Sequence, residues 1–346
     1  MQPLPHAPRT VDRSGRSRSR LTSLVGVLLA LALSLTACGD SDGEDGPTGS
    51  GQTGAAGSFP VSVTHAKGKT VVPSKPKRVV ALGYVDVAVA RALGAPIVGA
   101  LKFGGGADGR NFPAVTPPLD EDVAVLDEVK PNVEKIAALR PDLILMTSGQ
   151  PTYQEVFAKL SAIAPTLGYR TKLAQDDPTE TTQLIGELLG EKQTAAELIA
   201  RSERAIADFV AKYPEAKGRK ALFGQALPDN AYLLVTPDAQ VNRFFARLGL
   251  TVPAEFAALA GDVGPTGSAA LSLEELDRLD AADIAFLLFR DAKIKDHALV
   301  KALDLTKTGR LASLDMGTAY VVLLPNPANT AYLLSKIEPT VAKLVQ

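Results

Sequence analysis

The feature that most constrains the fold is a set of short aliphatic runs that do not alternate with polar residues. A strand with one face in water alternates, whereas a strand of a parallel sheet, covered by helices on both faces, is apolar throughout. These runs are also shorter than an ordinary helix. They predict buried strands at RVVAL (78–82), PIVGA (96–100), DLILM (142–146), KALFG (220–224), AYLLV (231–235), DIAFLLF (283–289) and AYVVLL (319–324).

Helical patterns separate several of these predicted strands. Strand and helix in turn, joined by short loops and right-handed crossovers, predict an α/β fold with mostly parallel central sheets flanked by helices. We detect no internal sequence repeat. Apolar residues recur at the spacing of a helix face in segments 85–94, 132–140, 152–161, 272–280 and 329–344.

One longer helix is predicted in the middle of the chain. Residues 191–212 contain no proline or glycine, and Pro214 and Gly218 follow them. In a single doubly wound domain this helix would be one more crossover. Its length and central position favour an interlobe helix, which implies small closure motions. We therefore expect an N-terminal lobe (59–190), an interlobe helix (191–213) and a C-terminal lobe (214–346).

The N-terminus has the three parts of a secretion signal. Five arginines and one acidic residue occupy residues 1–20, and the apolar run LTSLVGVLLALALSL covers residues 21–35. That run is shorter than a membrane-spanning helix needs, and small residues follow it. A buried core helix is the alternative, but such a helix should not follow a basic segment at the start of a chain. We predict a signal peptide at residues 1–37.

Cys38 is the only cysteine in the chain. The stretch Leu35-Thr36-Ala37-Cys38 resembles the lipobox of bacterial lipoproteins, and the resemblance implies cleavage before Cys38 and attachment of a diacylglycerol to its thiol. A free thiol is the alternative. The glycine- and aspartate-rich residues 38–58 then form a flexible tether, and the protein is held on the extracytoplasmic face of the cell membrane.

Charge and motif content exclude several function classes. Removing residues 1–37 lowers the formal net charge from −1 to −5, which argues against a nucleic-acid partner. The match to GxGxxG at 104–109 is followed by prolines, so no helix can begin there to bind a dinucleotide. No GxSxG motif is present. The histidines His6, His65 and His297 are isolated, so we expect no metal site, no cofactor and no enzymatic activity.

The segment PNVEKIAALRPDLILMTSG (131–149) resembles the helical-backbone (class III) substrate-binding proteins of ABC importers. Segments 69–100, 159–167 and 271–289 resemble the same family in the same order, and within it the likeness is to iron-siderophore binding lipoproteins. The resemblance runs from about residue 60 to the C-terminus. Within the quoted segment we interpret five residues as helix-start and strand-entry positions: Pro131, Asn132, Glu134, Pro141 and Asp142.

Candidate ligand-binding residues are those directly after the predicted strands, because ligands bind outside the carboxyl ends of open α/β sheets. Cationic and tyrosine side chains dominate this set, which suits a large and often anionic ferric siderophore. Ordinary surface charge is the alternative for each basic residue. The predicted residues are Tyr84, Lys102, Arg110, Tyr153, Arg170, Arg243 and Arg290, with Gln225, Asn326 and Asn329 at similar positions.

The chain departs from the family at two points. Tryptophan is absent and aromatic residues make up 5% of the sequence, which disfavours haem and cobalamin. Glu128 stands where the hydroxamate-binding branch carries an arginine, so a hydroxamate site is not implied. Family members dock on the permease through one carboxylate per lobe, and here the candidates are Asp86 and Glu274.

Together these observations predict a lipid-anchored, monomeric receptor that captures a ferric siderophore between two lobes and delivers it to an ABC permease. Two alternatives stay open. One is a receptor for haem or another metal chelate. The other is a surface lipoprotein that binds a protein or a cell-wall component and transports nothing.

Overall fold

The computed structural model of the chain describes residues 59–103, 110, 112–262 and 267–345. These residues belong to one compact unit, Thr53–Gln346. The predicted signal peptide, Cys38 and the tether lie outside the described residues, as does the glycine loop at 104–109. Among the described residues, no helix combines the length and the apolar character needed to cross a membrane.

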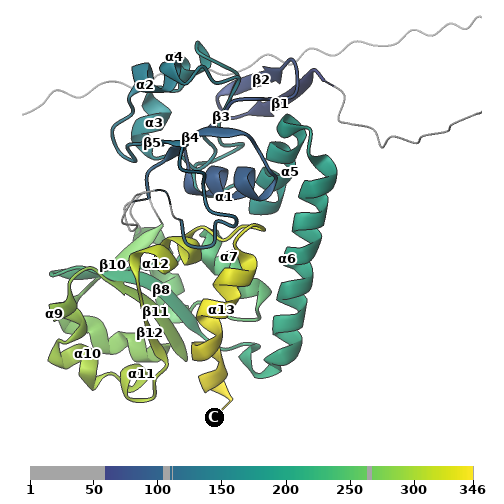
Figure 1. Cartoon of the computed structure of the whole chain (residues 1–346). Helices are drawn as coiled ribbons and strands as arrows, with labels where there is room; N and C mark the ends of the chain where they lie inside the picture. Colours follow the sequence, from purple (N-terminus) through teal and green to yellow (C-terminus); the bar gives the residue numbers. More distant parts are fainter. Residues whose placement is uncertain (1–58, 104–109, 111, 263–266, 346) are drawn as a thin grey trace, which may run out of the picture. The chain divides into compact units, whose positions relative to one another are not determined.

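The first lobe is built on a sheet of five parallel strands in the order β5-β4-β3-β6-β7. Figure 1 labels β3, β4 and β5 of this sheet. The three residues of β3 are fully buried, because strands pair with it on both sides and helices flank the sheet. The strands are β3 (Val79–Ala81), β4 (Ile97–Leu101), β5 (Ala124–Leu126), β6 (Leu143–Leu145) and β7 (Thr166–Leu167); the helices are α1 (Tyr84–Ala92), α2 (Val133–Ala138), α3 (Pro151–Glu155), α4 (Phe157–Ser161) and α5 (Pro178–Leu189).

The second lobe repeats this strand order in a sheet arranged β10-β9-β8-β11-β12. Strand β9 is antiparallel to both of its neighbours, and the other pairs are parallel. Strand β11 is apolar throughout because Phe286 and Leu288 enter one core while Ala285 and Leu287 enter the core on the opposite face. The strands are β8 (Ala221–Ala226), β9 (Asn230–Leu234), β10 (Ser268–Ser272), β11 (Ile284–Phe289) and β12 (Leu311–Leu314).

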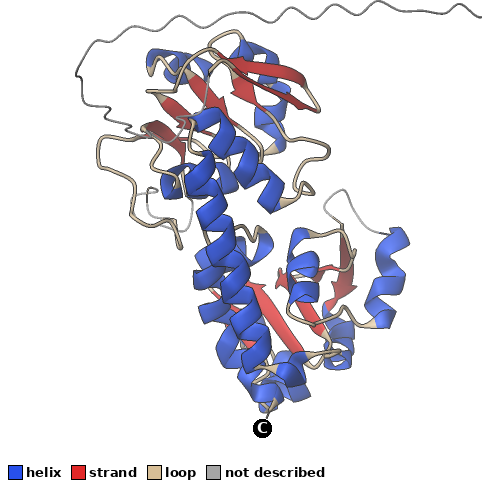
Figure 2. Ribbon diagram, turned by 90° about the vertical axis from the view of Figure 1, so that its right-hand side faces the viewer, coloured by secondary structure: helices blue, strands red, loops and turns tan. Residues whose placement is uncertain are grey.

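Helices flank this second sheet as well (Figure 2). Segment 272–280, predicted as an α-helix, is the 3-10 helix η3, which begins with a capping box between Ser272 and Glu275. The helices are α7 (Gln240–Arg247), α8 (Ala254–Ala257), α9 (Ala292–Lys295), α10 (Ala298–Ala302), α11 (Asp304–Lys307), α12 (Met316–Leu323) and α13 (Thr330–Val341), with 3-10 turns η1 (Pro214–Ala216), η2 (Ala258–Asp262), η3 (Leu273–Ala281) and η4 (Ala342–Leu344).

The predicted strand at 319–324 is wrong, because residues 319–323 lie within helix α12 and Leu324 is its C-cap. Asp315 caps the helix by accepting a hydrogen bond from the backbone N–H of Thr318 at 2.9 Å. Val321 and Val322 are both buried, with 7% and 0% of their surface exposed. A short helix buried on most of its faces is as continuously apolar as a buried strand, so periodicity alone could not separate the two.

Helix α6 (Lys192–Lys212) joins the two lobes (Figure 1). Its first half contributes Ala195 and Leu198 to the core of the first lobe, and its second half contributes Ile206 and Phe209 to the core of the second. Between them, Ser202 Oγ lies 2.7 Å from Thr330 Oγ1 of α13. The expected architecture, two mostly parallel sheets flanked by helices and joined by one long helix, is confirmed.

A two-stranded hairpin that we did not predict precedes the first sheet. It consists of β1 (Val61–His65) and β2 (Gly68–Val72), paired antiparallel. Thr70 Oγ1 donates a hydrogen bond to the backbone carbonyl of Thr166 in β7. The hairpin is therefore attached to the edge of the first sheet.

Candidate functional site

A small cavity lies where the two lobes meet, with about 20 Å³ of free space. Its first-lobe wall comes from the start of α1 and the chain after β4, and its second-lobe wall comes from α12 and the turn that follows it. Tyr84 lies three residues after β3 and Phe103 two residues after β4, so this wall stands at the carboxyl edge of the first sheet, where ligands of open α/β sheets bind. The cavity is lined chiefly by Tyr84, Phe103, Phe112, Gly317, Tyr320 and Asn329.

Four aromatic rings fill this region and contact one another across the interface. The ring centroid of Tyr84 lies 4.8 Å from that of Tyr320 and 5.2 Å from that of Phe112. The centroid of Phe103 lies 4.9 Å from Phe112 and 6.1 Å from Tyr320. These separations are in the range of favourable edge-to-face and tilted ring pairs. The first lobe supplies Tyr84, Phe103 and Phe112, and the second lobe supplies Tyr320.

Tyr84 is held in this cluster by its place in the sequence and by one hydrogen bond. It is the first residue of α1, three residues after the end of β3, and Gly83 precedes it as the N-cap. Its hydroxyl donates to Glu128 Oε2 at 2.8 Å. Burial, and then this hydrogen bond, raise the pKa of the Tyr84 phenol above its ordinary value. The phenol is therefore a neutral donor, engaged with a carboxylate of its own lobe.

The second-lobe wall approaches the first lobe closely at Gly317. A Cβ atom built there would lie 2.3 Å from Pro113 Cγ, well inside van der Waals contact. Asn326 and Asn329 form the turn after α12: both side-chain amides donate to the carbonyl of Leu324 at 3.1 Å, and the Asn329 side chain accepts from the Asn326 N–H at 2.9 Å. Both side chains line the cavity with their polar groups engaged.

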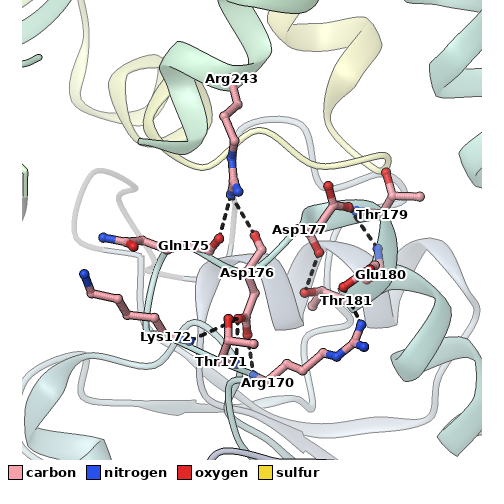
Figure 3. A network of polar contacts seen from close by, with 10 residues as sticks. All are labelled: Arg170, Thr171, Lys172, Gln175, Asp176, Asp177, Thr179, Glu180, Thr181 and Arg243. Atoms are coloured by element: carbon pink, nitrogen blue, oxygen red, sulfur yellow. Dashed lines mark hydrogen bonds and ion pairs between the residues drawn. The ribbon is translucent and has the colours of Figure 1, made fainter. Parts of the chain in front are cut away.

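A second set of contacts between the lobes surrounds Arg243 (Figure 3). This side chain comes from α7 and donates to the backbone carbonyls of Gln175 at 2.7 Å and Asp176 at 3.2 Å in the first lobe. Gln240 Nε2 also donates to the Asp176 carbonyl, at 3.0 Å. The guanidinium of Arg243 is thus bonded to backbone oxygens of the opposite lobe.

The Asp176 carboxylate holds together the loop whose backbone carbonyls accept hydrogen bonds from Arg243 (Figure 3). That carboxylate accepts from the backbone N–H groups of Arg170, Thr171 and Lys172, and from Thr171 Oγ1 at 2.6 Å. Arg170 itself is exposed and forms an ion pair with Glu180. Arg170 therefore lies in the first lobe, outside the cavity lining.

The remaining predicted ligand residues are distributed around the interface. Lys102 and Gln225 are exposed. Arg110 is half-buried, with Nε 3.4 Å from the Val123 carbonyl. Tyr153 is fully buried and donates its hydroxyl to the Asp127 carbonyl. Of the seven predicted ligand-binding residues, all within the described part of the chain, Tyr84 alone lines the cavity.

Arg290 contacts the helix that forms the second-lobe wall of the cavity. It follows β11 and is exposed, and its Nη1 lies 3.2 Å from the Sδ of Met316, the first residue of α12. Because α12 also carries Gly317 and Tyr320, Arg290 stands beside the helix that forms this wall.

Asp86 does not have the exposure that permease docking requires, so its assignment to that role is wrong for this structure. It is fully buried in α1. Its carboxylate accepts from the backbone N–H and the hydroxyl of both Thr147 and Ser148, at 2.6 to 3.1 Å. Burial raises the pKa of Asp86, while these four donors oppose the rise. Its role is to hold the start of α1 against the chain after β6.

Glu274 is exposed in the first turn of η3, as docking would require. The two sheets reveal a counterpart that sequence reasoning missed. Helix α2 follows β5 and precedes β6, just as η3 follows β10 and precedes β11, and the paired strands hold the same places in their sheets. Glu134, exposed in the first turn of α2, is therefore the topological equivalent of Glu274.

The interpretation of Asn132 as a helix-start residue is confirmed. Its side chain caps α2 by accepting from the Lys135 N–H at 2.8 Å. Asp142 accepts from the N–H groups of Lys77 and Arg78 at the entry to β3. Among the described residues, no group of three or more histidine, cysteine, aspartate or glutamate side chains could hold a metal ion.

Comparisons of this chain with known proteins agree with one another. The sequence model of the family described as "Periplasmic binding protein" matches residues 79–316. The chain is 27% identical over 310 residues to the Fe(3+)-citrate-binding protein YfmC of Bacillus subtilis, covering 87% of this chain and 91% of that protein.

Two further matches cover most of the chain. It is 26% identical over 266 residues to the Fe(3+) dicitrate-binding periplasmic protein FecB of Escherichia coli, covering 75% of this chain and 84% of that protein. A solved periplasmic solute binding protein from Mycobacterium smegmatis superposes with a TM-score of 0.69 at 25% identity, covering 83% of this chain and 99% of that chain.

Proposed function

Because this chain belongs to the periplasmic binding protein family, we propose that it is the extracytoplasmic receptor of an ABC importer and that its ligand is a ferric siderophore or a related ferric chelate. The observation that carries the proposal is the cavity between the lobes, whose walls come from both halves of the chain. A ligand bound there contacts both lobes, so binding and closure are coupled. The similarity to two ferric-citrate-binding proteins supports iron chelates as the ligand class.

The charges around the cavity suit a chelate that carries negative charge at its edge. Arg290 beside α12 and Lys102 after β4 are both exposed, and guanidinium and ammonium groups can pair with carboxylate or phenolate oxygens of a ligand. The ligand itself supplies the donors to iron, so the protein need only bind the outside of the chelate.

Attachment to the membrane through Cys38 is part of the same proposal. The lipobox-like sequence supports it, and a diacylglycerol provides the two acyl chains that stable anchoring needs. The residues between Cys38 and β1 would then allow the receptor to reach its permease while staying at the membrane.

Docking on the permease is proposed to use Glu134 and Glu274. A helix that connects two parallel strands runs antiparallel to them, so α2 and η3 both begin at the carboxyl edge of their sheet. Both exposed carboxylates therefore lie on the side of the lobes where the ligand binds. A permease that contacts both carboxylates would respond to a change in the separation of the two lobes.

The test is direct binding to residues 53–346, the compact unit. Calorimetry and thermal shift should be run with ferric tricatecholate, trihydroxamate and dicitrate complexes, and with haem and cobalamin. We expect at least one ferric chelate to bind and to raise the unfolding temperature. Folded protein that binds none of these ligands would overturn the proposal, and binding of haem alone would replace the siderophore with a different metal chelate.

A further inference from the structure

We propose that the preferred ligand is a ferric chelate whose iron-binding arms carry aromatic rings, as in catecholates and phenolates. This inference rests on the proposed function and narrows its ligand class. It differs from what the names of the two relatives above would suggest, because ferric citrate has no aromatic ring. It is carried by the four-ring cluster of Tyr84, Phe103, Phe112 and Tyr320, which we call the aromatic cluster.

The cluster lines the cavity and includes ring contacts between the lobes. Tyr320 is the second-lobe member, and it meets Tyr84 and Phe103 at centroid distances of 4.8 and 6.1 Å. Because the cavity has only about 20 Å³ of free space, a siderophore fits between these walls only if Tyr320 moves away from these two rings. Separation exposes ring surface on both lobes, and a bound ligand must replace the lost ring contacts. A planar aromatic arm placed between the lobes restores them on both of its sides.

A small carboxylate chelate fits this wall poorly. The face of an aromatic ring carries negative potential, so carboxylate oxygens against it are disfavoured. Glu128 adds a carboxylate behind Tyr84, and the amides of Asn326 and Asn329 already donate to the Leu324 carbonyl. The cations Arg290 and Lys102 are exposed rather than part of the cavity lining. The polarity of the site therefore suits a chelate with aromatic arms near the cluster and charge near the solvent.

The first test compares three probes on the same protein by calorimetry: ferric enterobactin as tricatecholate, ferric dicitrate, and ferrioxamine B as an aliphatic trihydroxamate. We expect the tricatecholate to bind at least about tenfold more tightly than either aliphatic chelate, as stacking on several rings would give. Equal or tighter binding of ferric dicitrate or ferrioxamine B would overturn this inference and leave the receptor function intact. If no probe binds, the proposed function itself fails.

The second test uses variants of Tyr320, with thermal unfolding to show that each is folded. Tyr320→Ala should weaken ferric enterobactin by about tenfold and ferric dicitrate by less than about twofold, because only the aromatic arm loses a ring partner. Tyr320→Phe keeps the ring and should retain affinity. The matched control is Tyr213→Ala, since Tyr213 packs on Phe209 and bonds Glu338 in the second lobe, outside the cavity lining. An equal loss for both chelates in Tyr320→Ala would overturn the inference.

Discussion

At the scale of single residues, His65 shows how a hydrogen-bond chain fixes a protonation state. Thr70 Oγ1 donates its proton to the Thr166 carbonyl, so at its contact with His65 Nε2, 2.9 Å away, the hydroxyl must accept. Nε2 therefore carries the ring proton. Nδ1 accepts from the Lys67 N–H at 3.2 Å, so it is unprotonated. The imidazole is neutral, and burial lowers the pKa of His65 below its ordinary value of 6.5.

This lowered pKa predicts a pH-dependent loss of stability. As pH falls through 6.5 the unfolded chain takes up a proton at His65 and the folded chain does not, so the free energy of unfolding decreases until the pH reaches the lowered pKa of the folded state. Above 6.5 the contribution is fully present. Melting temperatures at pH 7.5, 6.5 and 5.5 should fall more steeply for the wild type than for His65→Gln.

The control for that measurement is His297→Gln, because His297 is exposed at the start of α10. It should keep the wild-type slope. If His65→Gln and His297→Gln show the same pH dependence as the wild type, the assignment of a neutral, buried His65 is incorrect.

The sequence could predict part of the site at this scale. Tyr84 is found by the rule that ligands meet residues just after parallel strands. After β4 the same rule selected Lys102, whereas the neighbouring Phe103 lines the cavity. Tyr320 could not be found, because its segment was predicted as a strand. Charge misled the choice of Arg170 and Arg243: their partners are Glu180 and two backbone carbonyls, which no local pattern indicates.

At the scale of elements, the sequence predicts buried strands well, but it does not separate them from short buried helices or reveal very short strands. Strands β3, β6 and β11 are apolar because both faces are covered, which is what a non-alternating run indicates. Helix α12 has the same composition for a different reason, since it packs between the second sheet and the opposite lobe. Strands β5 and β7 have three and two residues, too few for any periodicity to emerge.

Helix α6 leads to a prediction about cooperativity. Because it contributes Leu198 to one core and Ile206 to the other, loss of either core also exposes apolar surface of the helix that supports the other. Leu198→Ala and Ile206→Ala should each cost about 2–5 kcal/mol, and each should lower the temperature of one shared calorimetric transition.

Val210→Ala is the control on the same helix, since Val210 is 39% exposed and its truncation should cost less than about 0.5 kcal/mol. Two separate heat-absorption peaks, with each core variant moving only one of them, would contradict the coupling.

At the scale of the whole molecule, the separation of the two lobes depends on how closely α12 approaches the first lobe. Gly317→Ala places a Cβ 2.3 Å from Pro113 Cγ, so we expect the lobes to move apart. With Cys38 absent, spin labels on Lys159→Cys and Lys301→Cys, both exposed and in different lobes, should report a longer distance in ligand-free Gly317→Ala than in its parent.

The control is Gly261→Ala, because no atom of the described residues lies within 4 Å of a Cβ built at Gly261. It should leave the label distance unchanged. An unchanged distance in Gly317→Ala would mean that the contact relaxes locally and does not set the separation of the lobes.

Permease docking makes the second prediction at this scale. Glu134→Lys and Glu274→Lys should each reduce uptake of radioactive iron by cells that depend on this receptor, and the double variant should abolish it, because both carboxylates are proposed to contact the permease. Ligand affinity of the purified variants should stay within about twofold, since neither side chain lines the cavity. Glu255→Lys, an exposed charge on α8, is the control. Full uptake by the double variant would remove both residues from the docking proposal.

The common strand order of the two sheets has a consequence for the symmetry of the complex. The lobes share no detectable sequence repeat, yet each places an exposed glutamate in the first turn of the helix before its fourth strand. One polypeptide thus offers two copies of the same local feature, as a dimer would. Under the docking proposal, the two glutamates would make equivalent contacts, so two identical permease subunits could each bind one lobe of this receptor.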